Sequence, residues 1–188
     1  MNPIDEYIEI IDRLFGVYFD ATYGFHLGVS EIQRQNEEAL EGLEGNLDKA
    51  RYELDLKQLT YSIDKPSEIV HSVTVRDYKY RNWPGGHNEQ WAARMALVTI
   101  YSFWEHRYRS LIAKHLDKKP DDLKVDELGD LRHYRHAIIH YLGRGYEDFN
   151  KLEVFKWFGH GDEIRLDVQK MRTITESLKA AITKLNCA

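Results

Sequence analysis

The segment WAARMALVTIYSFW, residues 91–104, decides the fold class of this chain. Its only charged side chain is Arg94, so a helix built from it is apolar on nearly all sides. Such a helix needs other helices around it, and it therefore belongs at the centre of a helical bundle. We expect the helix to begin at Asn88, whose side chain can cap free amides, and to continue to about His115.

Two more helices are predicted after this central one. Asp126 opens a helix that ends at Gly143. Asp167 caps a last helix, whose apolar side chains recur at three- and four-residue spacing. Between these helices, residues 154–166 place apolar residues on both sides of a Gly-His-Gly turn, which indicates a small hairpin.

The first 87 residues are predicted to be a helical and extended addition to this bundle. A cap at Asn2 starts a helix that we expect to end near residue 20. A capping box at Ser30 then restarts a polar helix, and the acid-rich residues 31–57 form a solvated helical face. Prolines, glycines and β-branched residues in 64–87 indicate a short strand or extended arm and a turn.

Length and composition limit the classes of protein to which this chain can belong. The chain has 188 residues, of which 43% are hydrophobic and 30% charged, which suits one compact domain. We expect a single all-α domain over residues 1–188, with its core in 88–185 and a small β decoration. The single cysteine excludes a disulfide framework and a cysteine-based zinc site. Without a cationic leader or 18 consecutive apolar residues, a cytoplasmic location and no membrane partner are expected.

Charge is distributed unevenly along the chain. The net charge is −5, from 26 basic and 31 acidic side chains. Residues 1–60 carry 5 basic and 13 acidic side chains, whereas residues 61–188 carry 21 basic and 18 acidic ones. The net charge argues against a protein that coats nucleic acid through its global field. A local site for an anion is expected in the second part.

The segment LRHYRHAIIH, residues 131–140, is the strongest candidate motif. On a helical projection its apolar side chains lie on one side, with Arg135 on their flank. Four basic side chains share the opposite side: Arg132, His133, His136 and His140. His140 is a candidate acid–base group, because the helix C-terminus favours its charged form and a nearby arginine disfavours it.

Glu105 adds a second candidate, on the central helix. A carboxylate in this apolar setting needs a partner, because an unpaired buried charge costs several kcal/mol. Arg109, four residues later, or Arg135 would supply it. In one interpretation Glu105 orients Arg135 for function, and in the other the two form only a structural ion pair.

The spacing of Arg135 and His140 resembles the motif of HEPN domains, the "higher eukaryotes and prokaryotes nucleotide-binding" helical bundles. In both, an arginine precedes a histidine by four intervening residues, and a polar residue, here His136, follows the arginine. The segment YSFWE, residues 101–105, is similar to the aromatic-then-acidic segment often found before the motif in that superfamily. The resemblance covers about residues 88–185.

The resemblance implies a function. Many HEPN proteins are metal-independent ribonucleases of toxin–antitoxin, abortive-infection and other defence systems, and they usually act as dimers. Arg135 would then bind the phosphate, His140 would transfer protons, and Glu105 would orient Arg135. The implied substrate contacts are Arg132, His136, His133 and Arg109. The implied partners are RNA, a second copy of the chain, and an antitoxin or other defence-system protein, with no cofactor.

Three alternatives stay open. His133, His136 and His140 would share one helix face, as metal ligands do, but no cysteine or carboxylate completes the set and the arginines would repel a cation. The chain would otherwise be a catalytically silent HEPN scaffold that binds a nucleotide or a partner protein. The third alternative is a helical oligomerisation module, with residues 31–57 as its interface.

Overall fold

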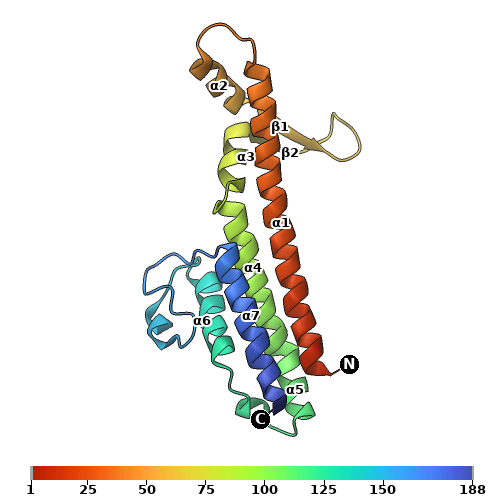
Figure 1. The fold of residues 1–188 in the computed structure, drawn as a ribbon, viewed down its shortest axis with the longest axis vertical. Coiled ribbons are helices and arrows are strands. Elements are labelled where there is room, and N and C mark those ends of the chain that lie inside the picture. Colours follow the sequence, from red (N-terminus) through yellow and green to blue (C-terminus); the bar gives the residue numbers. More distant parts are fainter. Residues whose placement is uncertain (1, 188) are drawn as a thin grey trace. The chain divides into compact units, whose positions relative to one another are not determined.

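The computed structural model describes residues 2–187 and is mostly helical (Figure 1). Its helices are α1 (Pro3–Leu40), α2 (Leu47–Leu56), α3 (Val75–Asn82), α4 (His87–Phe103), α5 (Arg109–His115), α6 (Asp126–His140) and α7 (Val168–Lys184). A π-helical turn (Trp104–Tyr108) joins α4 to α5, and 3-10 turns lie at Pro120–Asp122, Glu147–Lys151 and Leu185–Cys187. Strands β1 (Gln58–Ser62) and β2 (Ile69–Thr74) pair antiparallel. The prediction of an all-α fold with a small β decoration is confirmed.

The chain divides into two compact units. The bundle unit contains the first 20 residues together with those from Gln90 onward, and the hairpin unit contains residues 21–89. This division differs from the predicted boundary at residue 87, because the start of α1 belongs to the bundle. Its residues Ile4, Tyr7 and Ile11 recur at three- and four-residue spacing and are fully buried.

The core of the bundle unit forms between α1, α4, α6 and α7. Leu97 and Ile100 of α4 are fully buried, as are Tyr134 of α6 and Ile174 of α7. The hydroxyl of Tyr7 donates to the carbonyl of Ile100 at 3.2 Å, so the buried phenol is satisfied. In Figure 1 the start of α1, α4 and α7 lie side by side in this unit.

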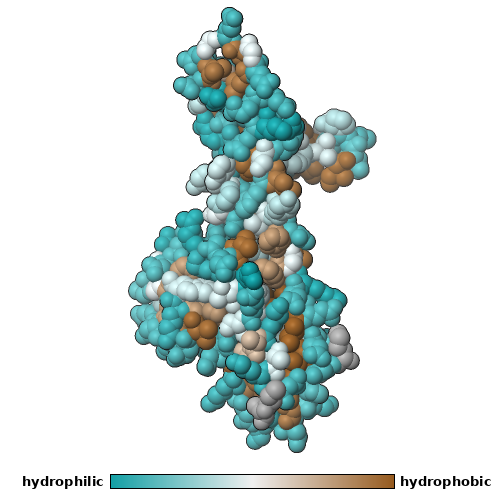
Figure 2. All heavy atoms as spheres, in the orientation of Figure 1, coloured by the Kyte–Doolittle hydropathy of each residue, from teal (hydrophilic) through white to brown (hydrophobic). Residues whose placement is uncertain are grey.

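The central helix is covered on one side, whereas the sequence predicted neighbours all round. Ala93 and Leu97 are fully buried, but Trp91, Met95 and Phe103 are 42%, 52% and 38% exposed. The prediction that other helices surround the central helix is therefore wrong within the described residues. Hydrophobic residues also reach the face drawn in Figure 2, as patches between hydrophilic ones.

Two predictions for the hairpin unit and α1 are corrected. The helix break near residue 20 and the restart at Ser30 are wrong, because α1 is continuous and the Ser30 hydroxyl donates to the His26 carbonyl inside it. Gly28 leaves room for the Tyr78 hydroxyl, which would lie 2.2 Å from a β-carbon at this position. The predicted cap at Asn2 is confirmed, since its side chain accepts from the Ile4 amide at 2.9 Å.

Helix caps and strands also differ in part from prediction. Asp167 caps α7 as expected, by accepting from the Lys170 amide at 2.7 Å. The helix expected to begin at Asn88 begins at His87. The acid-rich stretch of 31–57 is split between α1 and α2, and strand β1 was not expected at all. No helix within residues 2–187 has the length and apolar character needed to cross a membrane.

Candidate functional site

The inner face of α6 holds the following loop by hydrogen bonds to its backbone. The Asp130 carboxylate, 1% exposed, accepts from the amides of Glu153 (2.8 Å), Val154 (2.8 Å) and Phe155 (2.7 Å). The Tyr134 hydroxyl donates to the Phe155 carbonyl at 2.6 Å. These side chains take the backbone groups that a strand partner would have used. The hairpin predicted in 154–166 is therefore wrong: the start of this segment is held by α6, and its second half pairs with the turn after α6 through an isolated antiparallel bridge between Arg144 and Glu163.

Arg94 fixes the turn that follows α6. Its buried guanidinium donates to the Ile164 carbonyl at 2.8 Å and to the Glu163 carboxylate at 3.0 Å. It also lies against Gly143, where a β-carbon would come within 2.8 Å of it. Gly143 has a φ of 76°, in the left-handed region that suits glycine. The one charge of the apolar segment thus anchors the end of the motif helix.

Arg135 lies half-buried between α6 and α4, and its contacts are loose. One guanidinium nitrogen is 3.9 Å from a Glu105 oxygen, and the guanidinium carbon is 5.9 Å from the centre of the Tyr101 ring. The Tyr101 hydroxyl is 3.5 Å from the other Glu105 oxygen. The buried Nε of Arg135 has no hydrogen-bond partner within the described chain. Few groups therefore compete with a ligand for this arginine.

The expected pair between Glu105 and Arg109 is not formed. Arg109 instead donates to the Pro120 carbonyl at 2.9 Å and to Asp121 at 3.0 Å. Glu105 lies in the π-helical turn, which holds more residues than an α-helical turn and so changes which side chains share a face. Of the two partners expected for Glu105, Arg135 lies near it, at 3.9 Å, and His106 is 3.7 Å from the same carboxylate oxygen.

The histidines of the motif come together with two tyrosines. The rings of His136 and His140 are 4.6 Å apart, and those of His136 and Tyr146 are 4.9 Å apart. Tyr141 stacks on Tyr146 with 5.0 Å between ring centres. His140 is exposed, whereas His136 is half-buried. The shared histidine face agrees with the helical projection, and Tyr146 was missed as its neighbour because it comes from an aperiodic loop.

His133 completes this cluster. Its Nδ1 lies 2.8 Å from the Tyr146 hydroxyl. Burial lowers the pKa of His133 below its usual value, and the positive charge of Arg132 lowers it further. His133 is therefore expected to be neutral at pH 7 and to act as a hydrogen-bonding group.

Arg135 and His140 do not meet within one chain. Five residues apart on a helix, they point about 140° away from each other. Arg135 faces Glu105 and Tyr101, and His140 lies in the cluster with His136. A single site that uses both residues needs a second copy of the chain or a ligand that spans them.

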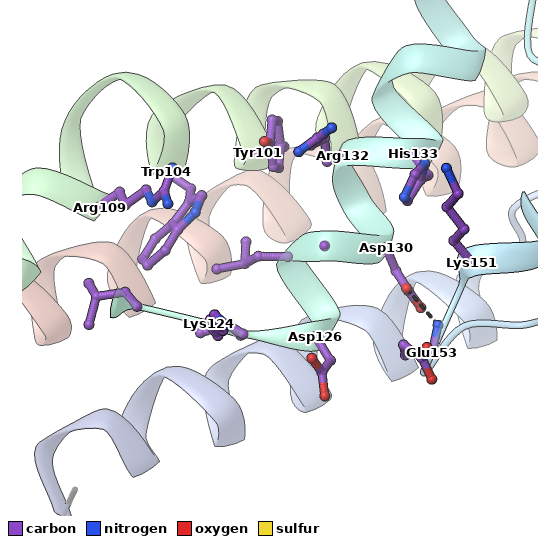
Figure 3. A pocket seen from close by; sticks show the side chains of 14 residues that line it. Tyr101, Trp104, Arg109, Lys124, Asp126, Asp130, Arg132, His133, Lys151 and Glu153 are labelled. Carbon is purple, nitrogen blue, oxygen red and sulfur yellow. Dashed lines mark hydrogen bonds between the residues drawn. The ribbon is translucent and has the colours of Figure 1, made fainter. Parts of the chain in front are cut away.

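A cavity of about 300 Å³ lies beside α6, next to the contacts of Arg135 (Figure 3). Its wall contains the predicted substrate residues Arg109, Arg132 and His133, together with Tyr101. The sequence did not point to two lysines that also line it, Lys124 and Lys151. Lys124 lies in the connection before α6 and Lys151 at the end of a short 3-10 turn, where apolar spacing carries little information about the direction of a side chain.

Across residues 2–187, no three histidine, cysteine, aspartate or glutamate side chains are placed to share a metal ion. No protein-family model, curated protein or solved structure matches this chain. Its function must therefore be argued from the chemistry of these residues.

Proposed function

We propose that this protein is a metal-independent endoribonuclease of the HEPN type, which acts as a homodimer in a toxin–antitoxin or anti-phage defence system. The observation that carries the proposal is the state of Arg135. This guanidinium is half-buried and loosely paired with Glu105, on the same helix as the exposed His140. A guanidinium that is held in place but forms few hydrogen bonds within the protein can bind a phosphate.

The chemistry needs no group beyond these side chains and the RNA. A base takes the proton of a ribose 2′-hydroxyl, and the 2′-oxygen forms a bond to the adjacent phosphorus. The bond from phosphorus to the 5′-oxygen breaks, and an acid protonates that oxygen. Arg135 binds the phosphoryl oxygens as charge develops on them, and His140 exchanges the protons. The products are a 2′,3′-cyclic phosphate and a 5′-hydroxyl.

A second copy of the chain supplies the geometry that one copy lacks. Because Arg135 and His140 diverge on α6, we assign the base and acid to His140 side chains of two protomers. Exposed apolar residues beside His140 support an interface there: Ile139 is 47% exposed, Tyr141 47% and Leu142 84%. Leu142 also has a φ of 53°, a strained conformation for a leucine, which is typical of functional positions.

The test compares the two motif residues with matched surface residues. Arg135→Ala and His140→Ala are expected to lower RNA cleavage at least about a hundredfold, while the controls Arg172→Ala and His115→Ala leave it unchanged. EDTA is expected to have no effect, and a single 2′-deoxy substitution at the cleaved site should block the reaction. Cleavage by His140→Ala at the wild-type rate would refute the assignment.

A catalytically silent scaffold is the second candidate, favoured by the ion pair between Glu105 and Arg135. In that case the pair holds the helices together, and the surface of α6 binds a nucleotide or a partner protein such as an antitoxin. The scaffold predicts that no RNA is cleaved by the wild type. As a ribonuclease, the protein would act in the cytoplasm, where its substrate lies.

A further inference from the structure

The cavity beside α6 contains cations that no internal partner neutralises. Arg132 and Lys124 form no hydrogen bond or ion pair with any residue in 2–187, and both side chains are exposed. The other two cations in the wall are already paired. Arg109 bonds to Asp121 at 3.0 Å, and Lys151 bonds to Asp148 at 2.7 Å.

The acidic residues of the wall do not cancel this charge. Asp130 is occupied by three backbone amides, and Glu153 pairs with Lys156 at 3.5 Å. Asp126 remains, and in Figure 3 its carboxylate points away from Arg132. The part of the cavity near Arg132 is therefore a site for an anion, with additional hydrogen-bonding groups from Tyr101 and His133.

The cavity continues the path of the proposed active site. Arg132 lies three residues before Arg135, on the neighbouring turn of α6. Tyr101 joins the two places, because it lines the cavity and its ring lies 5.9 Å from the Arg135 guanidinium carbon. Burial and the negative charge of Glu105 raise the pKa of Tyr101, and the positive charges of Arg132 and Arg135 oppose that shift, since both lie near the phenol. A polyanion bound at Arg135 would therefore lie next to the cavity.

We propose that this cavity is a nucleotide subsite, in which Arg132 binds the RNA phosphate next to the one held by Arg135, while Lys124 adds positive charge at another part of the wall. The volume of about 300 Å³ lies at the small end of ligand pockets and suits one nucleotide. The identity of the ligand as RNA rests on the proposed function, whereas the anion site itself does not. The subsite also explains how an acidic protein would hold RNA, by a few local contacts instead of a global field.

Binding is measured separately from cleavage with a probe that cannot react. A fluorescent single-stranded hexamer with 2′-O-methyl riboses lacks the attacking hydroxyl, so its anisotropy reports binding alone. The double variant Arg132→Gln/Lys124→Gln is compared with Arg172→Gln/Lys114→Gln, which loses the same two charges elsewhere on the bundle unit. Each single variant is measured as well, with a circular dichroism melt to verify folding.

The wild type and the control are expected to bind alike, and the cavity variant at least about tenfold more weakly, the effect of removing one charge-assisted hydrogen bond. Its slope of log affinity against log salt should be smaller by about 0.7 for each phosphate that the variant no longer binds. Equal affinity and slope in the cavity variant and the control would overturn the subsite, as would a wild type that does not bind the hexamer. Binding through the cavity without cleavage of unmodified RNA would refute only the ribonuclease. Cleavage with no loss of binding in the cavity variant would refute only the subsite.

Discussion

The polar side chains on the two faces of α6 differ in how fully they are hydrogen-bonded. On the inner face, Asp130 is almost fully buried and accepts three hydrogen bonds of 2.7 to 2.8 Å. On the other face, which includes the side toward α4, Arg135 is 3.9 Å from its carboxylate partner, and the exposed Arg132 has no partner within residues 2–187. The polar groups that hold the fold are saturated with hydrogen bonds, whereas the loosely held groups keep their capacity for a ligand.

The largest expected effect tests the inner face. Asp130→Ala removes the acceptor of three amides, including the buried amide of Phe155. We expect the free energy of unfolding to fall by about 2–4 kcal/mol, because hydrogen bonds to a charged group are strong and the amides are left unsatisfied. Urea denaturation followed by circular dichroism measures this loss.

Asp126 provides the matched control for that experiment. It is an aspartate on the same helix and in the same cavity wall, but it has no partner in the described chain. Asp126→Ala is expected to cost less than about 1 kcal/mol, the value of one charge near a helix N-terminus. If both variants lost the same stability, the three hydrogen bonds of Asp130 would not be what stabilises the loop.

A smaller effect is expected on the other face, from Glu105→Gln. The pair with Arg135 is long and its side chains are 29% and 37% exposed, so stability should change by less than about 1 kcal/mol. If Glu105 orients Arg135, kcat for RNA cleavage should fall about tenfold with little change in KM, because the arginine is misplaced in the transition state.

The control for Glu105 is Glu176→Gln, which removes the partner of the exposed Arg172. It should change neither stability nor kcat. A rise in cleavage or RNA affinity in Glu105→Gln would reverse the interpretation, since it would mean that Glu105 holds Arg135 away from the RNA.

The fold could be predicted from the sequence where it depends on residues that are close together in the chain. The starts of α6 and α7 and the caps Asn2 and Asp167 follow from neighbouring residues alone, whereas α6 ends at His140, before the predicted stop at Gly143. Segment 154–166 could not be predicted, because its backbone is bound by residues outside it, the Asp130 carboxylate and the turn after α6. The continuous α1 was missed because glycines cost a helix only about 1 kcal/mol each, which packing can offset.

The site was predictable to the extent that it lies on one helix. The shared face of His133, His136 and His140 follows from their spacing, and the cluster with Tyr146 does not. The partner of Glu105 could not be chosen from the sequence, because no residue pattern announces the π-helical turn. The lysines of the cavity come from segments with no regular spacing.

The smallest expected effect comes from His133, which stands between the two faces. Its folded pKa lies below the usual value of 6.5, through burial and the charge of Arg132, so the unfolded chain binds the proton more tightly. Stability contributed by His133 is therefore present above pH 6.5 and is lost as the pH falls from 6.5 through the folded pKa. The nearby carboxylates Asp148 and Asp130 oppose the shift. In urea denaturation between pH 7 and 5, His133→Gln should reduce the loss of stability relative to wild type, and His115→Gln should not. If the pH dependence of stability were unchanged in His133→Gln, His133 would not belong to the inner face of α6 that stabilises the fold.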